Sequence, residues 1–124
     1  MKLSVFAICL LCSSHAVAEW EWVGESNISN FYVDLATVSK NGSLLQVWQM
    51  EDFKQRGTEG LMSRSSRAEY DCQTERYRYL FQILYSKPMG RGKPRTIRHK
   101  GSPLWLEITS NSAAEVTLQT VCPE

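Results

Sequence analysis

The chain has 124 residues, with 14 basic and 13 acidic side chains and a formal net charge of +1. This near balance excludes the strong positive field by which many nucleic-acid-binding proteins attract their ligand. The length allows a single domain with one core.

The first 18 residues are typical of a secretory signal peptide. Met1-Lys2 gives a short basic start, and Leu3–Cys12 is an apolar run too short to span a bilayer. Ala16-Val17-Ala18 then supplies small residues at positions −3 and −1. We predict cleavage after Ala18, which leaves a domain of residues 19–124 outside the cytoplasm, in the periplasm or at the cell surface. No later stretch is apolar enough to form a transmembrane segment.

Two of the four cysteines belong to this exported domain. Because export leads to an oxidising compartment, we predict a disulfide between Cys72 and Cys122. In the chain-entropy model, a closed loop of about 50 residues is worth roughly 4 kcal/mol of stability. Cys9 and Cys12 lie in the signal and follow large apolar residues, so no lipid anchor is predicted.

Alternating polar and apolar residues predict strands along most of the exported domain. In chain order, the expected strands cover residues 19–23, 31–35, 43–53, 61–72, 75–86, 96–100 and 104–108. A turn at 27–30, the Asn41-Gly42 pair and loops at 54–60 and 87–92 separate them.

The strand 75–86 has the clearest alternation. Its apolar face is expected to hold Tyr77, Tyr79, Phe81, Ile83 and Tyr85, and its polar face Arg76, Arg78 and Gln82. We interpret the aromatic row as a core face beneath a helix; a platform on which a ligand stacks is the alternative. The four tryptophans are also expected in the core: Trp20, Trp22, Trp48 and Trp105.

The carboxy-terminal end changes to a helical period. Ser112 and Glu115 have the spacing of a capping box. The next apolar residues, with Cys122, share one helical face. The predicted fold class is therefore α+β: an antiparallel sheet of about six strands, with one C-terminal helix that the disulfide ties to the sheet.

An ordered set of residues resembles the surface-adhesin protein E family of Gram-negative bacteria. The set comprises Trp20 and Trp22, Tyr32-Val-Asp34, Val47-Trp48, Asp71-Cys72, Arg76-Tyr77-Arg78, Tyr85, Met89-Gly90 with Gly92, Trp105 and Cys122. The resemblance implies an antiparallel sheet with a C-terminal helix held by a disulfide. It also implies an exported binding domain whose partners are extracellular-matrix or serum proteins.

Haem binding has been associated with this family. The exported domain contains one histidine, His99, which has no second histidine to complete a haem or zinc site. We therefore expect no cofactor and no bound metal. Two further roles stay open: a periplasmic envelope-associated structural protein, and a carrier of a small ligand of the haem type. The sequence does not determine the oligomeric state.

Residues 87–100 contain six basic side chains and no acidic one: Lys87, Arg91, Lys93, Arg95, Arg98 and Lys100. The functional interpretation is a basic loop that makes charge-assisted contacts with acidic glycans, acidic protein segments or lipid phosphates. The alternative is a solvated loop whose charge protects a sheet edge.

No pattern typical of an enzyme occurs. The acidic pairs Glu51-Asp52 and Glu69 with Asp71 lack the spacing of a calcium loop, and they are interpreted as solvated charges rather than a glycosidase pair. No serine-nucleophile, phosphate-loop or dinucleotide motif is present. The sequence therefore predicts a binding protein that is not an enzyme.

Overall fold

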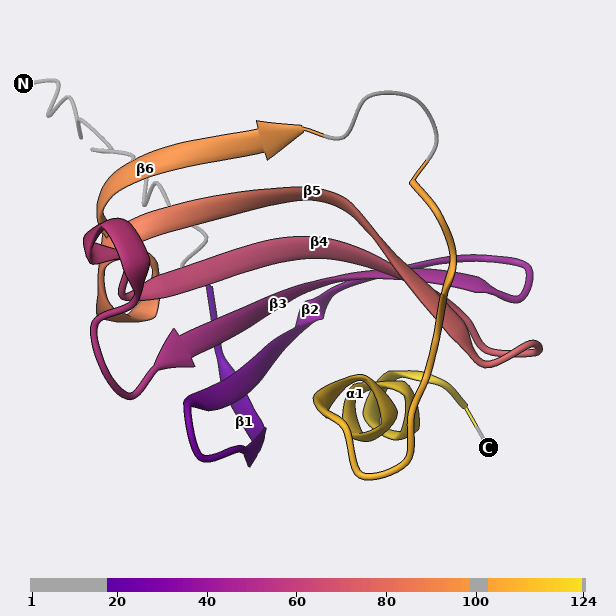
Figure 1. Ribbon diagram of the computed structural model, residues 1–124. Coiled ribbons are helices and arrows are strands. Elements are labelled where there is room, and N and C mark those ends of the chain that lie inside the picture. Colours follow the sequence, from indigo (N-terminus) through magenta and orange to yellow (C-terminus); the bar gives the residue numbers. More distant parts are fainter. Residues whose placement is uncertain (1–17, 99–102, 124) are drawn as a thin grey trace, which may run out of the picture.

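The structure is a computed structural model that describes residues 18–98 and 103–123. A curled antiparallel sheet runs in the spatial order β1-β2-β3-β4-β5-β6, with β7 paired to the far end of β5 (Figure 1). The strands are β1 (Glu21–Glu25), β2 (Ser29–Asn41), β3 (Leu44–Phe53), β4 (Ser63–Asp71), β5 (Arg76–Lys87), β6 (Arg91–Arg98) and β7 (Leu106–Glu107). Two short 3-10 turns, Thr58–Gly60 and Pro88–Gly90, and the helix α1 (Ala113–Val121) complete it.

The predicted fold class is confirmed, including the disulfide. Cys72 and Cys122 are bonded, with 5.7 Å between their Cα atoms. The helix begins as its capping box predicts, because the Ser112 side chain accepts a hydrogen bond from the backbone N–H of Glu115 at 3.2 Å. The proposed signal peptide lies outside the described residues except for Ala18.

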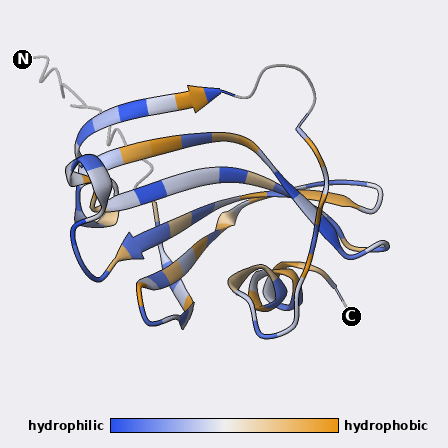
Figure 2. Ribbon diagram, viewed as in Figure 1, coloured by the Kyte–Doolittle hydropathy of each residue, from blue (hydrophilic) through white to orange (hydrophobic). Residues whose placement is uncertain are grey.

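The helix packs against one side of the sheet, against β1 and β2. The core between them contains Val33, Leu45, Val47, Ala68 and Tyr70 from the sheet and Leu118 and Val121 from α1. We call this side of the sheet the helix face and the opposite side the outer face. Figure 2 shows the alternation of hydrophilic and hydrophobic residues along the strands that these two faces require.

A β-bulge in β5 makes one prediction wrong. Ala68 pairs with Tyr79 and Arg67 pairs with Phe81, so Leu80 is an extra residue in the ladder. An extra residue reverses the face of every later side chain on the strand. The predicted single row of aromatic residues is therefore divided. Tyr77 and Tyr79 lie on the helix face; Phe81, Ile83 and Tyr85 lie on the outer face, and Gln82 lies on the helix face rather than beside Arg76 and Arg78.

β2 and β6 are longer than expected. β2 continues to Asn41 through an irregularity between Asp34 and Ser39, where the Thr37 hydroxyl oxygen replaces a ladder partner and accepts the N–H of Trp48 at 2.9 Å. The predicted loop at residues 87–92 is also wrong. β5 extends to Lys87, only residues 88–90 form the turn, and β6 begins at Arg91.

Candidate functional site

The basic residues singled out in the sequence lie along one edge of the sheet. Lys87 ends β5, and Arg91, Lys93, Arg95 and Arg98 belong to β6, whose residues are all exposed. Lys100 and His99 lie outside the described residues. We call the five described cations the basic edge. It is a strand rather than the predicted loop, and hydrophilic residues make up most of it (Figure 2).

The turn that places β6 at this edge is fixed by polar contacts. Met89 and Gly90, the two central residues of the turn closed by the Arg91 N–H donating to the Pro88 carbonyl, both have positive φ, 56° and 71°. The backbone N–H of Met89 donates to an Asp52 carboxylate oxygen at 2.9 Å, and that of Gly90 donates to the Ser63 hydroxyl at 2.9 Å. The ends of β3 and β4 therefore hold the start of the basic edge in place.

Few acidic groups balance the basic edge. Among the described residues, its one ion pair joins Arg95 to Glu59 at 3.2 Å, and both side chains are more than half exposed. The guanidinium of Arg98 lies 5.5 Å from the ring centroid of Phe81. An exposed row of cations on a β-strand can form charge-assisted hydrogen bonds to carboxylates or sulfates along an extended ligand.

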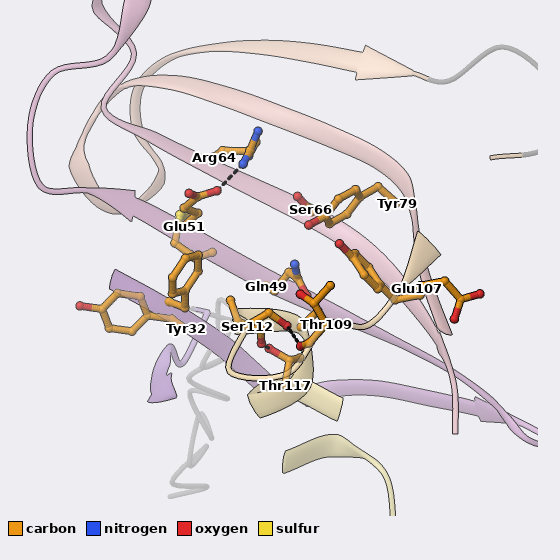
Figure 3. A pocket seen from close by; sticks show the side chains of 15 residues that line it. Tyr32, Gln49, Glu51, Arg64, Ser66, Tyr79, Glu107, Thr109, Ser112 and Thr117 are labelled. Carbon is orange, nitrogen blue, oxygen red and sulfur yellow. Dashed lines mark hydrogen bonds and ion pairs between the residues drawn. The ribbon is translucent and has the colours of Figure 1, made fainter. Parts of the chain in front are cut away.

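A second site, which the sequence did not predict, lies between the sheet and the start of α1 (Figure 3). This polar pocket has a volume of about 190 Å³. Its lining includes Phe31, Gln49, Glu51, Arg64, Ser66, Tyr77, Tyr79, Thr109, Ser112 and Thr117. The residues come from β2, β3, β4, β5, the segment before α1 and α1 itself, so no short sequence motif identifies the pocket.

The charged groups of the polar pocket are held by one another. Arg64 forms an ion pair with Glu51, and the Ser29 hydroxyl donates to the other oxygen of that carboxylate at 2.9 Å. Glu51 and Arg64 lie directly opposite each other on β3 and β4. Burial raises the pKa of Tyr79 to about 12, and nearby Tyr77 adds to the shift. The Tyr79 hydroxyl is therefore protonated even in moderately alkaline solution and can donate a hydrogen bond.

The polar pocket lies on the face of the sheet to which Arg95 of the basic edge projects, whereas Arg98 pairs with Phe81 and projects to the outer face. Glu51 pairs with Arg64, Arg64 with Leu84, and Leu84 with Arg95. Paired residues project to the same side, so this row leads across the helix face from the pocket to the edge. Arg64 and Arg95 are two strands apart, which is about 10 Å at the usual strand spacing.

The outer face has a separate, mostly apolar cleft of about 510 Å³. Trp20, Trp48, Ile83 and Tyr85 line it, with the buried Asp34 among its polar groups. Trp48 packs edge-on against Phe81, with ring centroids 5.1 Å apart. The part of the aromatic row that the bulge turns outward therefore forms a concave surface and not a core beneath the helix.

The acidic pairs noted in the sequence have structural partners. Glu69 accepts two hydrogen bonds from Arg78, at 2.8 and 2.6 Å, and Asp71 accepts the N–H groups of Gln73 and Thr74. The backbone hydrogen bond from Thr74 is the main cause that lowers the pKa of Asp71. Within residues 18–98 and 103–123, no three His, Cys, Asp or Glu side chains gather in an arrangement that could hold a metal ion.

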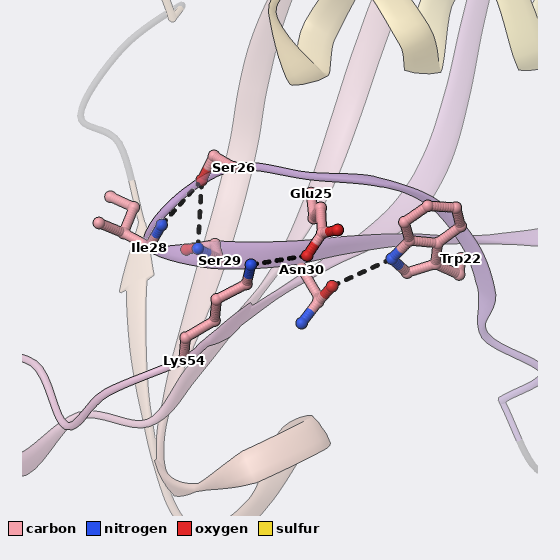
Figure 4. A network of polar contacts seen from close by, with 7 residues as sticks. All are labelled: Trp22, Glu25, Ser26, Ile28, Ser29, Asn30 and Lys54. Carbon is pink, nitrogen blue, oxygen red and sulfur yellow. Dashed lines mark hydrogen bonds and ion pairs between the residues drawn. The ribbon is translucent and has the colours of Figure 1, made fainter.

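The prediction that the tryptophans lie in the core is wrong. Among the described residues the core contains no tryptophan: Trp20 and Trp48 line the apolar cleft of the outer face, and Trp22 is 57% exposed. Its indole N–H donates to the Asn30 side chain at 3.1 Å, beside the ion pair of Lys54 with Glu25 (Figure 4). Trp105 takes part in cation–π contact, with the Arg78 guanidinium 4.3 Å from its ring centroid. A polar-aromatic alternation cannot identify the buried face when the strand, like β1, lies at the margin of the sheet.

Comparison with known proteins gives one family and one fold. A family model described as surface-adhesin protein E matches residues 20–123. A search of curated proteins gave no match. Among solved structures, crystal form II of Haemophilus influenzae protein E has a TM-score of 0.59 at 12% identity, covering 86% of this chain and 96% of that chain. Protein E from non-typeable Haemophilus influenzae has a TM-score of 0.57 at 12% identity, covering 86% and 76%.

Proposed function

The chain belongs to the surface-adhesin protein E family, and from this premise we propose that it is an exported, non-enzymatic binding protein that recognises acidic partners through its basic edge. The partners are acidic glycans or acidic segments of extracellular-matrix or serum proteins. The location is extracytoplasmic, after cleavage following Ala18. Within the described part of the chain, no helix has the length and apolar character needed to cross a membrane.

The observation that carries this proposal is the exposure of like charges on an edge strand. Lys87 and Arg91 face each other across the β5–β6 ladder, an arrangement that costs stability unless an anion lies between them. Lys93 and Arg95 extend the positive charge along the strand. Arginine is suited to this role because its guanidinium binds carboxylate or sulfate in a bidentate manner.

The test is retention on a heparin column. Replacing Arg91, Lys93 and Arg95 together with Ser should lower the salt concentration needed for elution, because each lost contact removes one released counterion. A triple replacement of Lys40, Lys54 and Arg56 with Ser, which removes the same charge elsewhere, is the matched control. Equal retention of the wild type and the β6 variant would contradict the proposal and leave an envelope-associated structural role.

A second candidate function, a small-ligand carrier, is favoured by the apolar cleft on the outer face. Its volume of about 510 Å³ falls within the range of small-molecule sites, roughly 300–1,000 Å³. An uncharged apolar fluorophore should then bind the wild type, and Trp48→Ala should weaken its binding while heparin retention stays unchanged. Fluorophore binding that survives Trp48→Ala would exclude this cleft as the carrier site.

A further inference from the structure

We infer that the polar pocket is a saccharide subsite, which takes one sugar ring of an acidic oligosaccharide whose anionic groups contact the basic edge. The inference rests on the proposed function and selects, among acidic partners, a glycan rather than a protein segment. The pocket lies on the helix face, to which Arg95 of the basic edge also projects, and it differs from the apolar cleft of the outer face.

The size and the walls of the pocket fit one ring. A volume of about 190 Å³ far exceeds the roughly 15 Å³ that a single water molecule needs, so the pocket has room for a small polar ring. Phe31, Tyr77 and Tyr79 supply aromatic surface, and the two tyrosine rings meet edge-to-face with centroids 5.6 Å apart. Aromatic surface packs against the C–H groups of a sugar ring, while the surrounding polar groups bind its hydroxyls.

The polar groups around the pocket offer both donors and acceptors. The Gln49 amide oxygen accepts the hydroxyl of Tyr70 at 2.7 Å, which leaves its amide N–H groups as donors. The Ser66 hydroxyl oxygen accepts from Gln82 at 3.1 Å and keeps its own hydrogen to donate. Glu51 supplies carboxylate oxygens as acceptors. A polyhydroxylated ring, whose hydroxyls both donate and accept, matches this mixture better than a carboxylate, which only accepts.

The position of these groups is fixed before any ligand binds. The ion pair between Arg64 and Glu51 orients both planar side chains at the wall of the pocket (Figure 3). On the other side, the capped start of α1 is held by Ser112, and the disulfide ties the end of the helix to the sheet. A preformed site loses less conformational entropy when it binds a small polar ligand.

The row of paired residues explains why the oligosaccharide should be acidic. From Arg64 the helix face continues through Leu84 to Arg95, about 10 Å away at the usual strand spacing. A sugar bound in the pocket therefore has its neighbours in the chain directed over β6. Sulfate or carboxylate groups on those neighbours would meet Arg95, the cation of the basic edge that projects to this face.

The experiment measures the affinity of a heparin tetrasaccharide and of poly-L-glutamate for the same proteins, by calorimetry at one salt concentration. Tyr79→Phe removes one hydroxyl from the pocket, and Tyr85→Phe, on the same strand but the outer face, is the matched control. We expect Tyr79→Phe to weaken tetrasaccharide binding by about 3- to 10-fold, the range for one lost hydrogen bond. Its binding to poly-L-glutamate should stay unchanged. The variant with Arg91, Lys93 and Arg95 replaced by Ser (the β6 variant) should bind both ligands more weakly.

The outcomes separate the two proposals. If Tyr79→Phe leaves tetrasaccharide affinity unchanged while the β6 variant loses it, the sugar subsite is wrong and the proposed function stands. The same holds if poly-L-glutamate binds as tightly as the tetrasaccharide, since the edge then recognises charge on a protein segment equally well. If the wild type binds neither ligand, the proposed function itself fails.

Discussion

Lys87 and Arg91 lie directly opposite each other at the start of the β5–β6 hairpin. Two cations in cross-strand register repel each other, so this pair weakens the hairpin that presents the basic edge. The tight turn between them is nevertheless held by Asp52 and Ser63. These contacts hold two like charges close together although their repulsion is unfavourable. Such an arrangement is expected of a surface that binds an anionic partner.

Reversing one charge of this pair should change stability and binding in opposite directions. Lys87→Glu converts the repulsion with Arg91 into attraction, so the free energy of unfolding should rise by about 0.2–1 kcal/mol in urea denaturation. Heparin retention should fall. Lys93→Glu is the control, since Lys93 has no residue in register on β5 and should weaken binding with no gain in stability. A Lys87→Glu protein that is less stable than the wild type would contradict the argument.

Removing the disulfide should cost a large share of the stability. Cys72 and Cys122 are 50 residues apart in sequence, and the double variant Cys72→Ser with Cys122→Ser should lose roughly 4 kcal/mol. Urea denaturation with and without a reducing agent measures this loss. The reductant should destabilise the wild type and leave the double variant unchanged. A reductant effect on both proteins would show that it acts elsewhere.

Replacing Gly92 should destabilise β6 more than replacing another glycine of the same φ class. Gly92 has φ +87°, and a Cβ there would lie 2.4 Å from the Ser86 hydroxyl and 3.1 Å from the backbone nitrogen of Lys87. Gly92→Ala should therefore cost about 1–3 kcal/mol. Gly42, with φ +64° and nothing within 4 Å, is the matched control. Equal losses in Gly92→Ala and Gly42→Ala would indicate that backbone strain alone, and not the close contact, sets the cost.

The buried tyrosines should make the protein sensitive to alkali. Burial raises the pKa of Tyr79 from its ordinary 10.0 to about 12, and burial also raises the pKa of Tyr70. A group with a raised pKa contributes its full stability below the pKa of the unfolded chain and loses it as pH rises towards the folded value. For Tyr79 this window is pH 10 to 12, with a loss of up to about 1.4 kcal/mol per pH unit.

The measurement is urea denaturation at a series of pH values from 8 to about 11.5, a range chosen to cover most of this window. Tyr79→Phe should show a shallower fall in unfolding free energy above pH 10 than the wild type. Parallel curves for wild type and Tyr79→Phe would mean that Tyr79 ionises equally easily in the folded and unfolded chain.

The sequence by itself determined the local elements of this protein. Alternation predicted the strands, Ser112 and Glu115 predicted where the helix begins, and the cysteine count predicted the disulfide. Each of these depends on neighbouring residues or on composition, and both can be read along the chain. The cluster of basic residues between 87 and 100 can also be read directly from the sequence.

Only the tertiary structure decided which side chains meet. The extra residue Leu80 shifts the register of β5 against β4, so it sends Phe81 to the face opposite Tyr79 although both fit one period of two. Residues 91–98 form an edge strand because β5 offers them partners 4 to 17 residues away. The polar pocket joins Glu51 and Arg64 to the start of α1. Such contacts depend on pairing between distant segments, and no local pattern in the sequence encodes that pairing.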